Sequence, residues 1–164
     1  MTATEESLAD EHHDLWLTPG QLASWLSVVR LITRLPCAID AQLQRDADLS
    51  MIEYMSMAML SEAPARTLRM SDLAERTSSS LSRLSHLVKR LESRGYVRRE
   101  ADPADGRFTN AILLPVGLSK LESAAPGHAA HVRQLVIDNL SPERLRRLGQ
   151  DADRIVGRID SPAR

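Results

Sequence analysis

The chain has 164 residues, of which 43% are hydrophobic but only 3% aromatic, and its formal net charge is −1 at pH 7. This length suits a single domain with an aliphatic core, which favours packed helices. A net charge so close to zero argues against indiscriminate binding to polyanions, and a single cysteine excludes a framework of disulfide bonds within the chain.

Residues 1–17 are interpreted as an acidic leader, because the first fourteen positions hold five carboxylates and no lysine or arginine. The leader lacks the basic start and apolar run of a secretory signal, so we expect a cytoplasmic protein. His12 and His13 would point in different directions on a helix and have no partners nearby, which indicates an incidental pair and not a metal site.

A long helix is predicted from Thr18-Pro19, an N-cap followed by a proline, to about Arg45. Pro36 should kink or break it. No apolar run approaches the length of a membrane span, so we expect no membrane contact and expect this helix to pack against more than its own subunit. Its apolar side chains recur every three or four residues, at Leu22, Trp25, Leu26, Val29, Ile32, Ile39 and Leu43.

Cys37 follows this proline and has two interpretations. We favour a small apolar side chain that is buried in the core. The alternative is a thiol-based redox-sensing regulator, which requires a stabilised thiolate and a cation close enough to lower its pKa. Arg34, one helical turn earlier, is the candidate cation.

A second helix is predicted over residues 51–61, capped at Ser50 and ended before Pro64. Its four methionines form a soft, adaptable wall. This wall is core filler in one interpretation, and in the other it lines a pocket for a small apolar or aromatic effector. The candidate pocket residues are Trp25, Met51, Tyr54, Met55 and His128.

Residues 71–114 carry the main functional signal. We predict a short helix over residues 71–77, a turn at Ser78-Ser79-Ser80, and a longer helix over residues 81–94 that Gly95 ends. Two helices joined by such a turn predict a helix-turn-helix motif, whose second helix reads DNA. The apolar stripe of the longer helix consists of Leu81, Leu84, Leu87, Val88 and Leu91.

The other face of this helix combines short hydroxyls with cations. Hydroxyls near its N-terminal end allow a close approach to base edges, and Arg or His can donate to guanine or to phosphate. The triple serine offers an N-cap and free amides suited to a phosphate. An ordinary amphipathic surface helix is the alternative. The candidate DNA contacts are Ser79, Ser80, Ser82, Arg83, His86, Lys89 and Arg90.

A two-stranded hairpin, called the wing, is predicted from residues 96–100 and 108–114. Residues 67–70 are expected to form a short extra strand that pairs with it. Turn dipeptides, Asp-Pro and Asp-Gly, lie in the loop of residues 101–107 between the two runs. The expected product is a helix-turn-helix followed by a wing.

The wing adds Arg98, Asp105 and Arg107 to the candidate DNA interface. An arginine at the tip, such as Arg107, can enter the minor groove or hold a phosphate. The charge of Asp105 cannot favour contact with DNA, so its expected task is to hold the Arg107 guanidinium by a two-pronged hydrogen bond. A plain turn with a solvated ion pair is the alternative.

Two further helices are predicted beyond the wing. The first starts at Pro115 and should bend where Pro126-Gly127 interrupts its pattern. His128 and His131 share one side of it, but no cysteine or acidic cluster accompanies them, so a metal site is not favoured. The last helix starts after Ser141 and should bury Leu145, Leu148, Ile155 and Ile159.

The order of these motifs resembles the MarR family of bacterial transcriptional regulators. The resemblance rests on Leu73-Ala74, the serine-rich turn, the helix pattern from Leu84 to Gly95 and the wing sequence Asp102–Arg107, with Asp105-Gly106-Arg107 as its most specific element. It covers about residues 20–158 and implies a winged-helix homodimer, usually a repressor released by a small ligand or by oxidation. Many members carry Arg where this chain has His86.

These observations predict a mainly α fold with a small β-wing. We assign residues 49–114 to a winged helix-turn-helix DNA-binding domain, and residues 18–48 and 115–160 to N- and C-terminal dimerisation helices. The expected function is a homodimeric repressor that binds an inverted-repeat operator in double-stranded DNA and responds to a small effector. The alternative from another class is a winged-helix module that binds proteins and not DNA.

No phosphate-cradling glycine loop or nucleophile elbow occurs in the sequence, and no serine or cysteine lies in a setting that supports nucleophilic catalysis. We therefore expect no enzyme activity, no cofactor and no bound metal.

Overall fold

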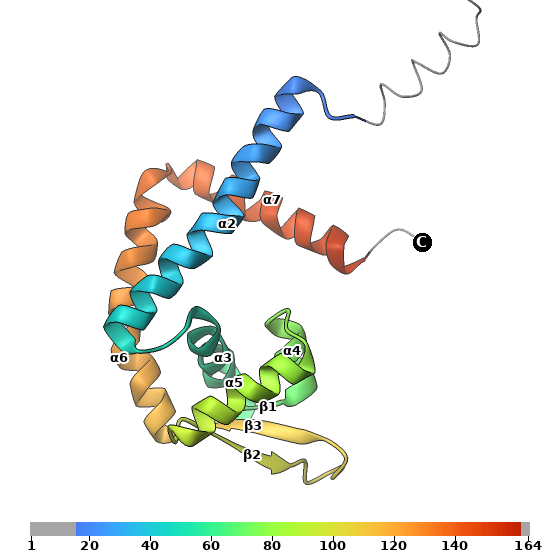
Figure 1. Cartoon of the computed structure of the whole chain (residues 1–164), viewed down its shortest axis with the longest axis vertical. Helices are drawn as coiled ribbons and strands as arrows, with labels where there is room; N and C mark the ends of the chain where they lie inside the picture. The colour runs from blue at the N-terminus through green and yellow to red at the C-terminus, as the bar shows by residue number, and fades with distance from the viewer. Residues whose placement is uncertain (1–15, 162–164) are drawn as a thin grey trace, which may run out of the picture. The chain divides into compact units, whose positions relative to one another are not determined.

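A computed structural model describes residues 16–161 of the chain (Figure 1). Its contacts divide the chain into two compact units, with the boundary between Ala38 and Ile39. Most of the predicted acidic leader, including His12 and His13, lies outside the described residues. The division of the chain into a DNA-binding domain and a dimerisation region stays a prediction.

Helix α2 (Pro19–Ala47) begins where the sequence predicts. The Thr18 hydroxyl accepts from the Gln21 N–H at 3.3 Å, and the Gln21 side-chain oxygen accepts from the Thr18 N–H at 2.8 Å, so the first turn is capped reciprocally. A break at Pro36 does not occur, because α2 continues to Ala47. One proline removes a single backbone donor, and the turns on both sides remain helical.

The composition of α2 corrects one expectation. By length and composition alone, this helix is long and apolar enough to cross a membrane. Arg30 and Arg34 are the only charged residues between Pro19 and Asp40, which is why the segment meets that criterion. A helix that pairs with another protein chain has the same composition, since a protein partner also covers apolar side chains.

The second unit contains the predicted helix-turn-helix. Its first three complete helices are α3 (Met51–Glu62), α4 (Met70–Arg76) and α5 (Leu81–Ser93). A capping box starts α3, in which the Ser50 hydroxyl accepts from the Glu53 N–H and the Glu53 carboxylate accepts from the Ser50 N–H. Helices α4 and α5 confirm the predicted order of short helix, turn and longer helix.

Three antiparallel strands accompany these helices in the order β1-β3-β2. They are β1 (Thr67–Arg69), which follows a 3-10 turn at Pro64–Arg66, β2 (Val97–Ala101) and β3 (Thr109–Leu113). Ala111 of β3 pairs with Leu68 of β1 on one side and with Arg99 of β2 on the other. The hairpin of β2 and β3 is the predicted wing, and β1 is the short strand expected to pair with it.

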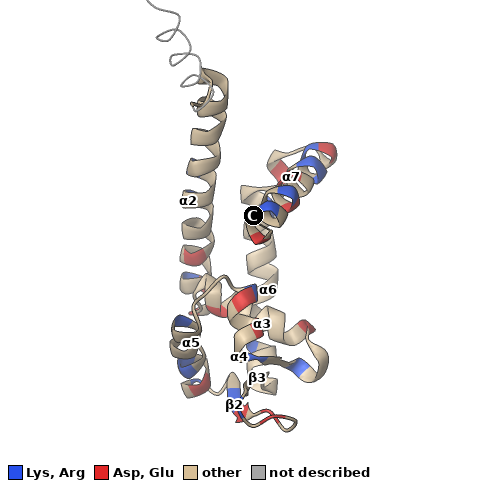
Figure 2. Ribbon diagram, turned by 90° about the vertical axis from the view of Figure 1, so that its right-hand side faces the viewer, with Lys and Arg blue, Asp and Glu red and all other residues tan. Residues whose placement is uncertain are grey.

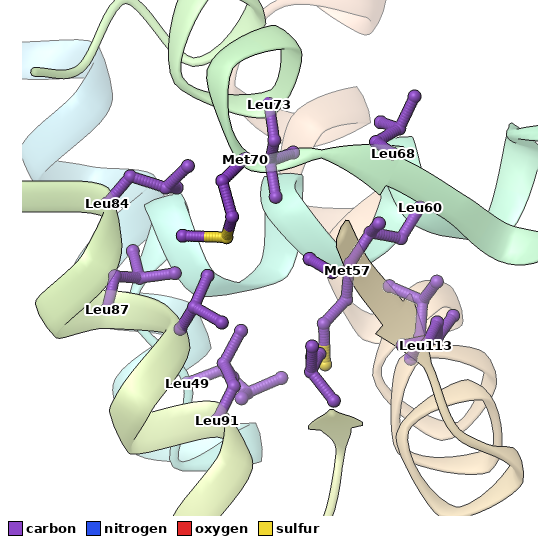
Figure 3. Close-up of a cluster of buried hydrophobic side chains, with 14 of the residues drawn as sticks. Leu49, Met57, Leu60, Leu68, Met70, Leu73, Leu84, Leu87, Leu91 and Leu113 are labelled. Atoms are coloured by element: carbon purple, nitrogen blue, oxygen red, sulfur yellow. The ribbon is translucent and has the colours of Figure 1, made fainter. Parts of the chain in front are cut away.

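The hydrophobic core joins α5 to α3 and the sheet (Figure 3). Its almost fully buried members include Leu84, Leu87 and Leu91 of α5 with Met57 and Leu60 of α3. Burial of one such side chain contributes about 1.5–3 kcal/mol, so these contacts fix which face of α5 points outward. Leu81 was predicted to belong to the same buried stripe, but its side chain is 56% exposed.

Helix α6 (Pro115–Leu135) follows β3 and approaches the wing closely at Gly117. A Cβ atom at Gly117 would clash with the carbonyl oxygen of Tyr96 and would lie 2.9 Å from the Cδ1 atom of Leu113. Pro126 lies inside α6, which continues to Leu135, and the bend expected there stays a prediction. As at Pro36, the neighbouring turns keep the segment helical.

Helix α7 (Pro142–Asp160) follows a 3-10 turn at Ile137–Asn139, and the Ser141 hydroxyl caps it. The prediction that α7 buries its apolar side is wrong for this chain alone. Nothing in the described part of the chain buries any residue of α7, and Ile159 is 69% exposed. The exposed apolar residues of this helix are Leu148, Ile155, Val156 and Ile159, and Leu145 is half-buried.

Candidate nucleic-acid interface

The local sequence positions α5 by a cap at each end. The Ser80 hydroxyl accepts from the Arg83 N–H at 3.3 Å and so satisfies one of the free amides of the first turn. After Arg94, Gly95 adopts a φ of +71°, which glycine tolerates readily and which turns the chain into β2. Ser79 is half-buried, and its hydroxyl donates to the Thr77 carbonyl at 3.3 Å. Ser79 and Ser80 therefore shape the turn itself.

The outward face of α5 carries exposed polar and basic side chains, and Figure 2 shows basic positions recurring along this helix. Ser82 lies near its start, and Arg83, His86 and Lys89 follow it, all of them exposed. Among residues 16–161, the three basic side chains form no ion pair, so their donors are free for another molecule. Donors and hydroxyls on a helix of this kind can bind phosphates and base edges.

Arg90 joins the same helix to α3. Its Nε atom lies 3.2 Å from Oε1 of Glu53, whose side chain is only 7% exposed. Burial would raise the pKa of Glu53, but hydrogen bonds from the Ser50 amide and hydroxyl and from Arg90 outweigh burial and hold this pKa below its ordinary value. Arg90 therefore supports the helix packing and still exposes most of its guanidinium.

The tip of the wing confirms the predicted pairing of Asp105 with Arg107. The Nε atom of Arg107 donates to Oδ1 of Asp105 at 2.9 Å, and its Nη2 atom donates to Oδ2 at 2.6 Å. These hydrogen bonds lower the pKa of Asp105 and raise the pKa of Arg107. The Arg107 side chain nevertheless remains 85% exposed. The pair thus presents an oriented guanidinium at the end of the hairpin.

Arg69 of β1 holds the two ends of the wing loop. Its Nε atom lies 3.0 Å from Oδ2 of Asp102, and its guanidinium carbon lies 4.4 Å from the centroid of the Phe108 ring. Hydrogen bonds from the Ala104 N–H and from Arg69 lower the pKa of Asp102 despite its burial. The sequence analysis did not identify Arg69, because its partner lies 33 positions away along the chain.

Two arginines on β2 differ in what they contact. Arg99 donates to both carboxylate oxygens of Glu92, and its Nη2 atom lies 2.7 Å from Oε2, so this pair fastens the end of α5 to the wing. Those hydrogen bonds lower the pKa of Glu92. Arg98, the predicted DNA contact, is exposed and lies 3.2 Å from the Glu100 carboxylate.

A groove of about 250 Å³ separates the start of α5 from the wing. Its apolar lining comes from α4, α5 and the wing, and its cationic lining comes from Arg99 of β2 and from Arg107 in the loop of the wing. The lining residues are Met70, Ser71, Leu81, Ser85, Arg99, Arg107, Phe108 and Thr109. The groove therefore lies between the start of α5 and the wing tip, where Arg107 reaches it.

The predicted effector residues are brought together only in part. The rings of Tyr54 and His128 lie 4.5 Å apart, between α3 and α6. Met51 and Met55 lie on the same helix as Tyr54, and Met55 is exposed. Trp25 is also exposed and belongs to the other compact unit. This pocket stays a prediction.

Gln42 was not identified from the sequence as a member of this group. Within the described part of the chain, Oε1 of Gln42, Nδ1 of His128 and Nε2 of His131 are buried without a hydrogen-bond partner. Burial, and to a smaller extent the charge of His131, lower the pKa of His128, while burial raises the pKa of Tyr54. No local sequence pattern predicts the position of Gln42, because only the packing of helices brings it close to His128 and His131.

Cys37 is exposed, so the favoured interpretation of a buried core cysteine is wrong for this chain alone. It belongs to the first compact unit, which ends at Ala38. A redox role for its thiol stays a prediction. Across residues 16–161, no three His, Cys, Asp or Glu side chains are grouped in a way that could hold a metal ion.

Comparison with known proteins gives a consistent result. A model of the MarR family matches residues 47–107. Sco3205, a MarR family transcriptional regulator from Streptomyces coelicolor whose structure is in complex with DNA, is 43% identical, with a TM-score of 0.84 over 90% of this chain and 96% of that chain. AbsC, a MarR family transcriptional regulator from the same organism, is 36% identical, with a TM-score of 0.83 over 88% of this chain and 97% of that chain.

The fold extends to more distant proteins. The transcriptional regulator BldR from Sulfolobus solfataricus is 22% identical, with a TM-score of 0.75 over 87% of this chain and 99% of that chain. No curated protein matches the chain.

Proposed function

The chain belongs to the MarR family of transcriptional regulators, and from this we propose that it is a homodimeric repressor that binds an inverted-repeat operator in double-stranded DNA. The observation that carries the proposal is the outward face of α5, where Arg83, His86 and Lys89 are exposed and unpaired within the described residues beside Arg107 of the wing. Sco3205, a relative at 43% identity, was solved in complex with DNA, which supports the same partner for this chain.

Each subunit would place α5 in a major groove and the wing at the neighbouring minor groove. The short side chain of Ser82 allows the helix to approach the base edges, and Arg83 and His86 can donate to guanine or to phosphate. Arg107, already oriented by Asp105, can enter the narrow minor groove as a fixed cation. Serines at the turn fix the helix start, so Ser79 and Ser80 would contribute mainly by shaping it.

The dimer would be built from exposed apolar helix faces. On α2 the exposed apolar side chains include Leu22, Trp25, Leu26 and Ile32, and on α7 they include Ile155 and Ile159. Isolated apolar residues are normal on a protein surface, but stripes at helical spacing are typical of an interface. Two-fold symmetry of the dimer then requires two half-sites about one helical turn, roughly 10 bp, apart.

A small effector would act near the contact between Tyr54 and His128. Three buried polar atoms without partners lie there, on Gln42, His128 and His131, beside an aromatic ring. Such a group suits a small apolar or aromatic molecule that also offers hydrogen bonds. The effector must bind one arrangement of the helices more tightly than the other, since equal affinity would shift no population.

We place the regulator in the cytoplasm, with its operator.

A winged-helix module that binds proteins is the alternative from another class. Interfaces with proteins are enriched in aromatic residues and depleted of lysine and serine at their centre. The outward face of α5 has the opposite composition, because Ser82, Lys89 and Ser93 are exposed there without an aromatic side chain among residues 81–93. This composition favours DNA.

Selection of bound fragments from random duplex DNA tests the proposal, followed by a titration of salt on the selected fragment. We expect an inverted repeat that binds at least about a thousandfold more tightly than random DNA. The slope of the logarithm of the affinity against the logarithm of the salt concentration should give the number of phosphates that the protein neutralises. Equal affinity for all fragments, or no binding, would refute the proposal.

A further inference from the structure

We propose that Leu81, at the first position of α5, reads the operator by packing against the C5-methyl group of a thymine. This inference rests on the proposed function, namely that α5 enters the major groove of DNA. It assigns a base-reading role to an apolar side chain that the sequence pattern places in the core.

Leu81 differs from the other leucines of α5 in how much of its side chain is exposed. Leu84, Leu87 and Leu91 are at most 4% exposed, whereas Leu81 is 56% exposed. Burial in the core therefore does not account for an apolar side chain at this position. An exposed leucine is tolerated on most surfaces, but this one lines a groove beside an exposed arginine, Arg107.

Helical geometry places Leu81 on the flank of α5 that faces the wing. Successive residues turn by about 100°, so Leu81 and Ser85 share one flank, and Ser82 and His86 lie between it and the opposite flank. The opposite flank carries Arg90, which contacts Glu53 of α3. Leu81 and Ser85 both line the groove between α5 and the wing.

The groove combines an apolar lining with a cationic rim. Its apolar side chains include Phe108, which is partly exposed and held beneath the Arg69 guanidinium at 4.4 Å, and Met70, which is buried. Arg107, oriented by Asp105 and 85% exposed, brings its guanidinium to the same groove, whereas Arg99 there is held by Glu92. A nucleotide offers the matching pair of features when its base carries a methyl group and its backbone carries a phosphate.

The chemistry of base edges singles out thymine. In the major groove guanine, adenine and cytosine present hydrogen-bonding groups, and thymine alone presents a methyl group. A leucine has no polar atom, so it can favour only that methyl group and disfavours the exposed polar edges of the others. Leu81 is also at the N-terminal end of α5, the part of a recognition helix that contacts base edges.

The test uses the full-length protein and the operator returned by selection. Each thymine of one half-site is replaced in turn by deoxyuridine, which lacks only the C5-methyl group, and binding is measured by fluorescence anisotropy. Burying one methyl group changes an equilibrium constant about fourfold. We expect the wild type to bind the operator about fourfold more weakly when deoxyuridine replaces the thymine at one position. The same replacement should leave the affinity of Leu81→Ala unchanged, because this variant already lacks the contact with the methyl group.

Three variants sharpen the comparison. Leu81→Met keeps an apolar side chain of similar volume and should retain the deoxyuridine effect. Leu81→Gln keeps the length and the helix propensity, and it should lose the effect even if the alanine variant were to fold poorly. The matched control Ile52→Ala truncates an exposed apolar side chain of α3 and should respond to deoxyuridine as the wild type does.

The inference is overturned if Leu81→Ala and Leu81→Gln keep the full deoxyuridine effect, if the wild type is insensitive at every thymine, or if the half-site contains no thymine. In each of these cases the wild type still selects an inverted repeat, so the proposed function stands. A wild type that binds no duplex DNA overturns both, and the selection step reveals this before any deoxyuridine is used.

Discussion

At the tip of the wing, a carboxylate lies directly beside the arginine that we propose to contact DNA. Removal of a negative charge from a surface that binds DNA should, by electrostatics alone, strengthen binding. The contacts between Asp105 and Arg107, at 2.6 and 2.9 Å, indicate the opposite outcome, because they hold the guanidinium in one orientation before DNA arrives. Substitution of Asp105 by a neutral residue should therefore strengthen operator binding if Asp105 mainly repels DNA, and weaken it if Asp105 mainly orients Arg107.

We expect Asp105→Asn to weaken operator binding about two- to fivefold, the modest change that is typical of an exposed ion pair. Anisotropy titrations at fixed salt measure the change. In an Arg107→Ala background the same substitution should no longer weaken binding, because no guanidinium is left to orient. Glu122→Gln, which removes an exposed carboxylate on α6, is the matched control. Tighter binding by Asp105→Asn would contradict this role.

The pKa of His128 predicts how stability depends on pH. Burial and the neighbouring His131 lower this pKa below 6.5 in the folded protein, so the unfolded chain binds more protons as the pH falls through that value. The contribution of His128 to stability is therefore fully present above about pH 6.5 and is lost as the pH falls below it.

Thermal unfolding between pH 5.5 and 7.5 should show this loss, and His128→Asn should show a smaller dependence on pH. His86→Asn serves as the control, because it removes an exposed imidazole from α5. A pH dependence that is unchanged in His128→Asn would rule out His128 as the group responsible.

At the scale of an element, Gly117 determines how closely α6 packs against the wing. A Cβ atom there would clash with the Tyr96 carbonyl oxygen, which is backbone and cannot rotate away. We expect Gly117→Ala to lower the free energy of unfolding by about 1–3 kcal/mol, the usual cost of overpacking. Urea denaturation measures this change.

Gly149 on α7 provides the matched control, because nothing lies within 4 Å of a Cβ atom built at that position. There the same substitution should stabilise the helix by about 0.5–1 kcal/mol through its better helix propensity. Equal effects at the two glycines would show that the close approach of α6 to Tyr96 is not significant.

The elements themselves were largely predictable, because their signals are local. Caps at Thr18, Ser50, Ser80 and Ser141 and the turn at Gly95 each mark a boundary within a few residues. Pro36 does not break α2, since a proline disfavours a helix locally but neighbouring turns and packing can outweigh it. The short strand β1 was expected over residues 67–70 and spans Thr67–Arg69.

The candidate site was predictable where it follows the period of one helix. Spacing along α5 identified Ser82, Arg83, His86 and Lys89, and the Asp-Gly-Arg sequence identified the wing tip. Contacts across the fold were not found, because no local pattern encodes them: Arg69 meets Asp102 and Arg90 meets Glu53 at separations of 33 and 37 positions. Leu81 was wrongly assigned to the buried stripe, because apolar periodicity does not show at which residue along a helix the core ends.

At the scale of the whole molecule, the apolar stripes on α2 and α7 stay exposed among residues 16–161. This is also why the burial of α7 could not be predicted correctly for a single chain. The part of α2 before Ala38 forms a compact unit of its own, and its Leu26 is 52% exposed. A second copy of the chain is the partner that we propose.

We expect Leu26→Arg to raise the dissociation constant of the dimer roughly a hundredfold, since an unpaired charge in an apolar interface costs about 3 kcal/mol or more. Sedimentation velocity across a range of protein concentrations measures it. Ser27→Arg adds the same charge about 100° further round α2, outside the stripe that contains Leu22 and Leu26, and should leave the dimer intact. A Leu26→Arg protein that remains dimeric would place the interface elsewhere.

The joint at Gly117 has a mechanical consequence for the regulator. Close backbone contact seats the start of α6 against Tyr96, so this half of the helix moves with the wing as one rigid piece. Pro126 removes a hydrogen bond from the middle of the same helix and makes it the softer point. His128 lies just beyond it, so a rearrangement there would flex α6 at Pro126 and tilt its two halves against each other, in the manner of a hinge.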